Sequence, residues 1–353
     1  MKGFFVCICS LFLGFVNAVE LDFYLWQRIH TQVVTEAVNR FYSNYSGDLY
    51  FLAGEFENNG KVVTLNLASK LNLSRSIPVF RIHIKHMNKS AQALADEIVK
   101  LYEPYRQAQS LQIDLDAPES KLLYYRDLML ELRKKLPGVK LSATVLPCHL
   151  KHRKNFFALA SACDFYVLQV HGLTKESGEW SIYNHRQAVA AVKKAKSIKK
   201  PFKVALPLYA NLLSNHQLVQ PNLYEVSELS KLCDEIIVFR LGIDSDGLSL
   251  DANTATAICN GNYAPRVHFH WVQKDENLWY LEVENSGFFS SMKSTLISYQ
   301  ESPLDIDTFN YSILNKDELQ FLLPPSGTKK LILWVRLKKG QSAPQIINLT
   351  IKD

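Results

Sequence analysis

Cysteine is scarce in this chain, which has six in 353 residues. Two of the six lie in the apolar N-terminal run, which leaves four for the folded part. Their spacing matches no zinc-binding pattern, and four cysteines in a chain of this length do not make a disulfide scaffold. We therefore expect buried free thiols rather than bridges. The four are Cys148, Cys163, Cys233 and Cys259.

Other absences exclude further classes of protein. No Gly-rich phosphate-binding fingerprint follows the first strand-like run, which argues against a dinucleotide-binding domain. The net charge of +6 is spread along the chain, and the densest basic run (KKAKSIKK, residues 193–200) ends a helical pattern. Such a run favours a solvated helix face over a patch for nucleic acid or membrane. We expect no nucleic-acid partner.

The N-terminus carries a targeting signal. Lys2 supplies a positive charge, residues 4–16 are almost wholly apolar, and Val16-Asn17-Ala18 has the small-residue pattern of a cleavage site. The apolar run is too short to favour a membrane span. The sequence predicts a signal peptide over residues 1–18 and export to a periplasm or out of the cell. A buried hydrophobic first strand is the alternative.

Strand-like and helix-like segments alternate over residues 19–262. Because helices that alternate with strands return the chain to the same edge of a sheet, the strands are expected to be parallel. Eight such units predict a closed (β/α)₈ barrel, also called a TIM barrel, in the α/β class. A doubly wound open sheet is the alternative. The expected strands are residues 21–28, 48–56, 77–85, 111–116, 140–146, 164–171, 202–209 and 235–241.

The sequence pattern changes after residue 262. Short strand-like runs separated by turn signals such as Pro324-Pro325-Ser326-Gly327 predict a small all-β sandwich over residues 263–353. No residue there has the context of a catalytic group, so the appendage is expected to be structural or ligand-binding. The expected strands are residues 267–271, 278–285, 293–299, 318–323 and 331–337, with a sixth possible at 345–351.

The strongest polar cluster ends the fourth expected strand. In this fold the site lies at the C-terminal ends of the strands. Strand alternation places Gln112, Asp114 and Asp116 on one face, and polar residues at three inward positions are hard to explain by packing. Two carboxylates so close favour one remaining protonated. We expect Asp116 as the acid/base, Asp114 as its electrostatic partner and Gln112 as a ligand contact. A structural network is the alternative.

Other strand ends add compatible groups. Glu55 is a candidate second carboxylate, and Trp26 could stack on a sugar ring. Together the strand ends predict a polar mouth with both charge signs and aromatic walls, which suits a polyhydroxylated ligand. We expect a carbohydrate ligand and no cofactor. The further expected contacts are Arg28, Arg81, His83, Gln169, His171, Tyr209 and Arg240.

Metal-dependent hydrolysis is a competing hypothesis. His83, His171, Asp114 and Asp116 could supply ligands in a barrel mouth. Against it, the first strand has no His-x-His and the chain has no sequence-local ligand pair. The sequence therefore predicts no metal site.

Several runs resemble a known family. They are WQRIH near the expected mature start, RIHIK, LQIDLDAPESKLLYYRDLMLELRKKLPGVKLSATVLP and DFYVLQVHG. They resemble the bacterial family called domain of unknown function 3142, roughly over residues 21–240, and Asp-x-Asp-Ala-Pro is the most specific part. The resemblance implies an exported protein with a barrel like those of glycoside hydrolases.

A looser resemblance is to chitinase-type glycosidases, whose fourth strand ends in Asp-x-Asp-x-Glu. Asp114 and Asp116 match the two aspartates, but Pro118 stands where the acid would be and Glu119 comes one residue late. Two functions therefore remain open. One is a hydrolase acting on a glycan or cell-envelope polymer, and the other is a non-catalytic glycan-binding or envelope scaffold protein on a degenerate barrel.

Overall fold

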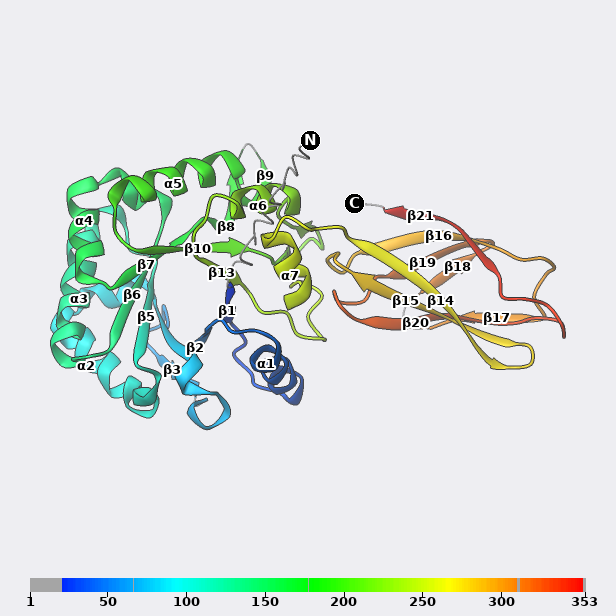
Figure 1. Cartoon of the computed structure of the whole chain (residues 1–353), viewed down its shortest axis with the longest axis horizontal. Helices are drawn as coiled ribbons and strands as arrows, with labels where there is room; N and C mark the ends of the chain where they lie inside the picture. Colours follow the sequence, from blue (N-terminus) through cyan, green and yellow to red (C-terminus); the bar gives the residue numbers. More distant parts are fainter. Residues whose placement is uncertain (1–20, 66, 177, 310–311, 352–353) are drawn as a thin grey trace, which may run out of the picture.

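The computed structural model describes residues 21–65, 67–176, 178–309 and 312–351. The predicted signal peptide lies outside the described residues. Eight parallel strands form a closed barrel, because β1 (Leu21–Leu25) pairs with β2 (Leu49–Phe56) on one side and with β13 (Ile236–Phe239) on the other. The prediction of a (β/α)₈ barrel is confirmed (Figure 1). The strands between β2 and β13 are β4 (Ser76–Ile82), β5 (Ser110–Leu115), β6 (Lys140–Val145), β7 (Phe165–Gln169) and β10 (Phe202–Pro207).

Helices surround the barrel because each has one apolar stripe. In α3 (Leu122–Lys135) the buried residues recur every three or four positions, as at Tyr125, Leu128 and Leu132. No helix in the described part of the chain has both the length and the apolar character that crossing a membrane requires. The other helices are α1 (Gln32–Asn44), α2 (Ala91–Tyr102), α4 (Arg153–Ala162), α5 (His185–Ile198), α6 (Leu223–Ser230) and α7 (Ala252–Cys259).

Short strands and 3₁₀ helices lie between the barrel strands and the main helices. In the segment between β2 and β4, β3 (Val62–Thr64) pairs antiparallel with β2. Two hairpins were not predicted: β8 (His171–Glu176) with β9 (Glu179–Tyr183), and β11 (Asn211–Leu212) with β12 (Leu218–Val219). The 3₁₀ helices are η1 (Ala68–Lys70), η2 (Leu73–Arg75), η3 (Ile84–Asn88), η4 (Glu103–Ala108), η5 (Glu119–Lys121) and η6 (Pro147–Lys151).

The barrel interior is filled by side chains rather than open. Tyr24, Tyr50 and Val79 meet inside it with apolar residues of β7, β10 and β13. The part that β5 and β6 contribute is polar: the Gln112 amide donates to the Tyr24 hydroxyl at 2.7 Å and to Thr144 Oγ1 at 3.0 Å. Because the interior is packed, a ligand has access only at the mouth.

A β-sandwich of two four-stranded antiparallel sheets follows the barrel. Its core contains Leu281, Val283, Phe321 and Leu333, all fully buried. Strands β17 and β18 were not predicted, because they are short. One sheet is β14 (Arg266–Asp275), β15 (Leu278–Ser286), β20 (Lys329–Arg336) and β17 (Asp305–Thr308). The other is β18 (Ile313–Asn315), β19 (Glu318–Leu322), β16 (Met292–Ser298) and β21 (Gln345–Ile351).

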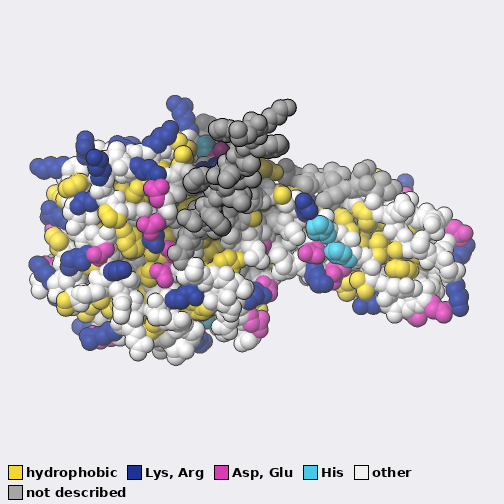
Figure 2. All heavy atoms as spheres, in the orientation of Figure 1, with side chains coloured by type: hydrophobic (Ala, Val, Ile, Leu, Met, Phe, Trp, Pro, Cys, Tyr) yellow, Lys and Arg dark blue, Asp and Glu magenta, His cyan; other side chains and the backbone are white. Residues whose placement is uncertain are grey.

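Charge and thiols follow the sequence-based expectation. Lysine and arginine side chains are scattered over the visible face of the barrel instead of forming one patch (Figure 2). All four cysteines in the described residues are free, and three of them are buried. Burial raises the pKa of Cys163 to about 12, so this thiol is a packing residue and not a nucleophile at neutral pH.

Candidate functional site at the barrel mouth

Three neighbouring strands bring ionisable residues together at the mouth. In the strand register Glu55 lies beside Arg81, and Arg81 lies beside Asp114. Paired residues on adjacent strands share a face, so these three side chains form one row. Asp116 follows β5 directly and is exposed. The mouth therefore unites carboxylates that are far apart in the sequence.

Asp114 lies at the centre of this row and has an altered acidity. Burial and the neighbouring Asp116 carboxylate raise its pKa to about 7, although Arg81 and a hydrogen bond from Thr144 act in the opposite direction. A carboxyl group with this pKa is largely protonated just below neutral pH, which is the state a general acid needs. The two aspartates are chemically different, one sheltered and one exposed.

Glu55 is held by two arginines. Its Oε2 lies 2.6 Å from Arg28 Nε, and its Oε1 lies 3.0 Å from Arg28 Nη2 and 3.3 Å from Arg81 Nη1. Both of its oxygens are thus engaged, while the side chains of Arg28 and Arg81 remain 62% and 47% exposed. The geometry makes Glu55 an anchor for two arginines at the rim.

Two hollows meet at Asp116. One, of about 660 Å³, is also lined by Arg28, Glu55, Arg81 and His83. The other, of about 430 Å³, is lined by Gln169 and His171, by η6 and by the β8–β9 hairpin. Asp116 lines both. It therefore lies where a chain-like ligand crossing from one hollow to the other would pass.

Aromatic rings form one wall of the mouth. Phe239, which the sequence did not single out, lies 5.4 Å from Trp26, 5.0 Å from Tyr209 and 5.1 Å from His171, measured between ring centroids. Burial lowers the pKa of His171 to about 3, so its ring is neutral at ordinary pH. Tyr209 is itself buried and its hydroxyl lies 3.3 Å from His171 Nδ1. These contacts fix the rings before any ligand binds.

Four expected ligand contacts do not line the two hollows. Gln112 is fully buried beneath Asp114, so it supports the mouth from below and cannot contact a ligand. Trp26 and Tyr209 belong to the aromatic cluster around Phe239 but line neither hollow. Arg240 lines neither hollow, and its guanidinium is bound by Asp246 at 2.7 Å and by Ser249 at 2.8 Å. Strand parity placed these residues on the right elements but could not show their depth.

The position of the chitinase-type acid has no carboxyl group. Pro118 occupies it, and Glu119 bonds instead to His152 from the neighbouring η6 segment. That hydrogen bond lowers the pKa of Glu119, which favours its ionised form. Glu119 is thus directed to a surface partner and not into either hollow.

One supporting residue has no signal in the sequence. His149 is fully buried; its Nδ1 accepts from the Leu146 N–H at 3.1 Å, so its Nε2 carries the proton donated to the Ala117 carbonyl at 2.7 Å. This bond holds the turn that presents Asp116.

Replacing His149 by alanine is expected to reduce the free energy of unfolding by about 2–4 kcal/mol, since it leaves a cavity and two unpaired backbone groups. Urea unfolding would measure the change. His152→Ala is the matched control: His152 is exposed, so its loss should cost under about 1 kcal/mol. Equal losses in both variants would contradict a supporting role for His149.

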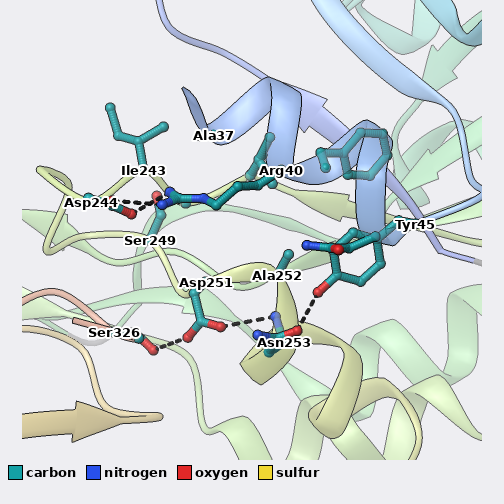
Figure 3. A pocket seen from close by; sticks show the side chains of 15 residues that line it. Ala37, Arg40, Tyr45, Ile243, Asp244, Ser249, Asp251, Ala252, Asn253 and Ser326 are labelled. Carbon is teal, nitrogen blue, oxygen red and sulfur yellow. Dashed lines mark hydrogen bonds and ion pairs between the residues drawn. The ribbon is translucent and has the colours of Figure 1, made fainter. Parts of the chain in front are cut away.

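The described residues support neither a metal site nor a charged ligand site beside the sandwich. Within the described residues no three His, Cys, Asp or Glu side chains are grouped closely enough to hold a metal ion. A cavity of about 220 Å³ lies beside the junction with the sandwich. Its charged groups already bind protein partners, Arg40 with Asp244 and Asp251 with Ser326 (Figure 3). Residues of both the barrel and the sandwich line this cavity, and these charged side chains are already paired within the protein.

Comparison with known proteins gives one family. Residues 75–222 match the model of domain of unknown function DUF3142. The DUF3142 resemblance is confirmed. The matched DUF3142 segment runs from the start of β4 to the residues before α6, so it includes Arg81, Asp114 and Asp116. No characterised protein matches the chain by sequence.

Solved structures show the fold. The spore cortex-lytic enzyme SleL of Bacillus megaterium QM B1551 superposes with a TM-score of 0.50 at 12% identity, over 70% of this chain and 74% of that chain. A chitinase from Chromobacterium violaceum ATCC 12472 gives a TM-score of 0.50 at 10% identity, over 70% of this chain and 100% of that chain. At these identities the likeness is one of fold alone: the chain shares the (β/α)₈ barrel of these two proteins.

Proposed function

We propose that this protein is a carbohydrate-active hydrolase that cleaves a glycan or cell-envelope polysaccharide at the barrel mouth. The observation that carries the proposal is the pair formed by Asp114, whose pKa is about 7, and the exposed Asp116 between two hollows. The Asp114 carboxyl, with its pKa near neutral pH, can give or take a proton beside a second carboxyl group.

In this proposal Asp114 supplies a proton to Asp116, which protonates the glycosidic oxygen as its bond to the anomeric carbon breaks. A water molecule adds to that carbon, and the proton that the water loses returns to the aspartate pair. Because the Asp116 carboxylate raises the pKa of Asp114, the two residues act as one functional unit. Trp26 and the Phe239 wall would stack on a sugar ring, and His171 and Gln169 would bind hydroxyl groups in the second hollow. The Glu55-anchored arginines, Arg28 and Arg81, would hold a polar or anionic substituent in the first hollow.

The test is product release. The purified mature chain would be incubated with peptidoglycan sacculi, chitin and β-glucans, and new reducing ends would be measured alongside Asp116→Asn and the matched control Glu119→Gln. We expect release by the wild type and by Glu119→Gln, and none above background by Asp116→Asn. Equal release by all three proteins would remove Asp116 from the mechanism.

Glycan binding without hydrolysis is the second candidate. It is favoured by Pro118 at the position of the chitinase-type acid and by the bonding of Glu119 to His152. Saturable binding of a polysaccharide by the wild type, with no new reducing ends, would select this function over the first.

Export belongs to the same proposal, since an envelope polymer lies outside the cytoplasm. Residues 1–18 have the composition of a signal peptide. N-terminal sequencing of protein recovered from the envelope or medium should begin at Val19. A chain that still begins at Met1 would contradict export by cleavage.

A further inference from the structure

A row of side chains crosses the outer face of one sandwich sheet. The strand registers place Val272 of β14 opposite Tyr280 of β15, Tyr280 opposite Trp334 of β20, and Trp334 opposite Asp307 of β17. Residues directly opposite one another share a face, so these four form a continuous line perpendicular to the strands. The ring of Phe309 lies 5.4 Å from that of Tyr280 and extends the line.

These aromatic residues are not needed for the sandwich core. Tyr280 precedes Leu281, and Trp334 lies between Leu333 and Val335; all three of these neighbours are fully buried in the core. Side chains alternate along a strand, so Tyr280 and Trp334 point away from the core. Tyr280, Phe309 and Trp334 are each partly exposed. Together the three rings form a contiguous aromatic strip on the outer face of the sheet, and contiguous apolar patches of this kind mark binding surfaces.

Charged groups border the aromatic row closely. Arg336 and Asp307 flank Trp334, and Glu282 lies on the same face of β15. Lys274 lies over the Tyr280 ring, with its Nζ 5.4 Å from the ring centroid. Hydrophobic side chains and charged or histidine side chains also adjoin one another on the visible face of the sandwich (Figure 2). The apolar part is therefore a narrow strip between polar borders.

We propose that this row, Tyr280, Trp334 and Phe309 with Asp307 and Arg336, is a second glycan-binding site, on the sandwich and separate from the barrel mouth. The apolar face of a sugar ring stacks on tryptophan or tyrosine, while carboxylate and guanidinium groups bond its hydroxyls. A protein partner is less suited, because the core of a protein interface is depleted of charge and about 800 Å² wide on each side. The occupant is a polysaccharide strand that crosses the sheet.

The experiment is sedimentation of the full mature chain with insoluble chitin, cellulose and peptidoglycan sacculi. We expect the wild type to bind at least one of them and Trp334→Ala to bind about tenfold more weakly, as when an aromatic anchor is removed from an interface. Trp334→Phe, which keeps a ring, should retain part of the affinity. The matched control is Leu322→Ala, which removes an exposed apolar side chain from the other sheet.

The variants distinguish glycan binding at the sandwich from hydrolysis at the barrel mouth. Asp116→Asn should sediment like the wild type, so loss of hydrolysis with retained binding supports the sandwich site even where the barrel is inactive. Equal sedimentation of Trp334→Ala, Leu322→Ala and wild type would overturn the proposal. So would a wild type that binds none of the three polymers. A wild-type dimer that becomes monomeric in Trp334→Ala, seen by light scattering, would assign the row to a second copy of the chain instead.

Discussion

Asp114→Asn is expected to lower kcat/KM on a hydrolysed glycan by about 10²–10⁴-fold, the usual contribution of a positioned acid or base. In the wild type the rate should fall as the pH rises through about 7, because burial and Asp116 hold the pKa of Asp114 at that value and only its protonated form supplies the proton. The fall should be absent from the residual activity of Asp114→Asn. Rates on one substrate between pH 5 and pH 9 would measure both effects.

Arg81 provides the matched pair of controls. Its positive charge lowers the pKa of Asp114, so Arg81→Gln should move the alkaline fall to higher pH, while Arg81→Lys should leave it near its wild-type position. A fall that stays in place in Arg81→Gln, or persists in Asp114→Asn, would assign it to a group other than Asp114.

Lys203→Met is expected to destabilise the barrel by about 3–5 kcal/mol at pH 8, the cost of leaving a buried charge without its partner. Lys203 Nζ lies 2.7 Å from Asp22 Oδ2 at the end of the barrel opposite the mouth, and their side chains are only 18% and 8% exposed. Burial raises the pKa of Asp22 even with Lys203 beside it. Without Lys203 the carboxyl should take up a proton more readily.

The sign of the pH effect follows from that shift. A carboxyl whose pKa is higher in the folded state than in the unfolded state favours folding at low pH, and this advantage is lost as the pH rises. The destabilisation of Lys203→Met should therefore be smaller at pH 5 than at pH 8 in urea unfolding. Lys196→Met is the control, since the Lys196–Asp234 pair is exposed and should be worth under about 1 kcal/mol. A loss in Lys203→Met that does not change with pH would exclude Asp22 as its cause.

The residues at the barrel mouth show what the side-chain alternation of a single strand can predict. Asp114 and Gln112 lie on the inward face of β5 as the alternation predicted, since a strand's side-chain period is fixed by its own backbone. The burial of each inward side chain could not be predicted from alternation. Gln112 is fully buried where it hydrogen-bonds to Tyr24 and Thr144, which come from other strands. Arg240 was placed on the correct strand, but Asp246 and Ser249 decide its direction.

The orientation of the Glu55 side chain depends on a register irregularity in β2 that the sequence does not reveal. Tyr50 and Leu52 face the barrel interior opposite Ile77 and Val79, so unbroken alternation would turn Glu55 outward. A register shift between Leu52 and Gly54 reverses the parity, and Glu55 comes to lie beside Arg81. Glu55 therefore faces the mouth because of this bulge and not because of strand alternation.

By itself the sequence determined the eight alternating units, the change to short strands after residue 262 and the aspartate pair at the end of β5, because each depends on the periodicity or composition of one segment. Only the tertiary structure decided the raised pKa of Asp114, the arginine clamp on Glu55, the His149 support and the aromatic row on the sandwich. Each of these joins residues from different strands or loops. Their register and burial arise when distant segments pair, and no single segment encodes them.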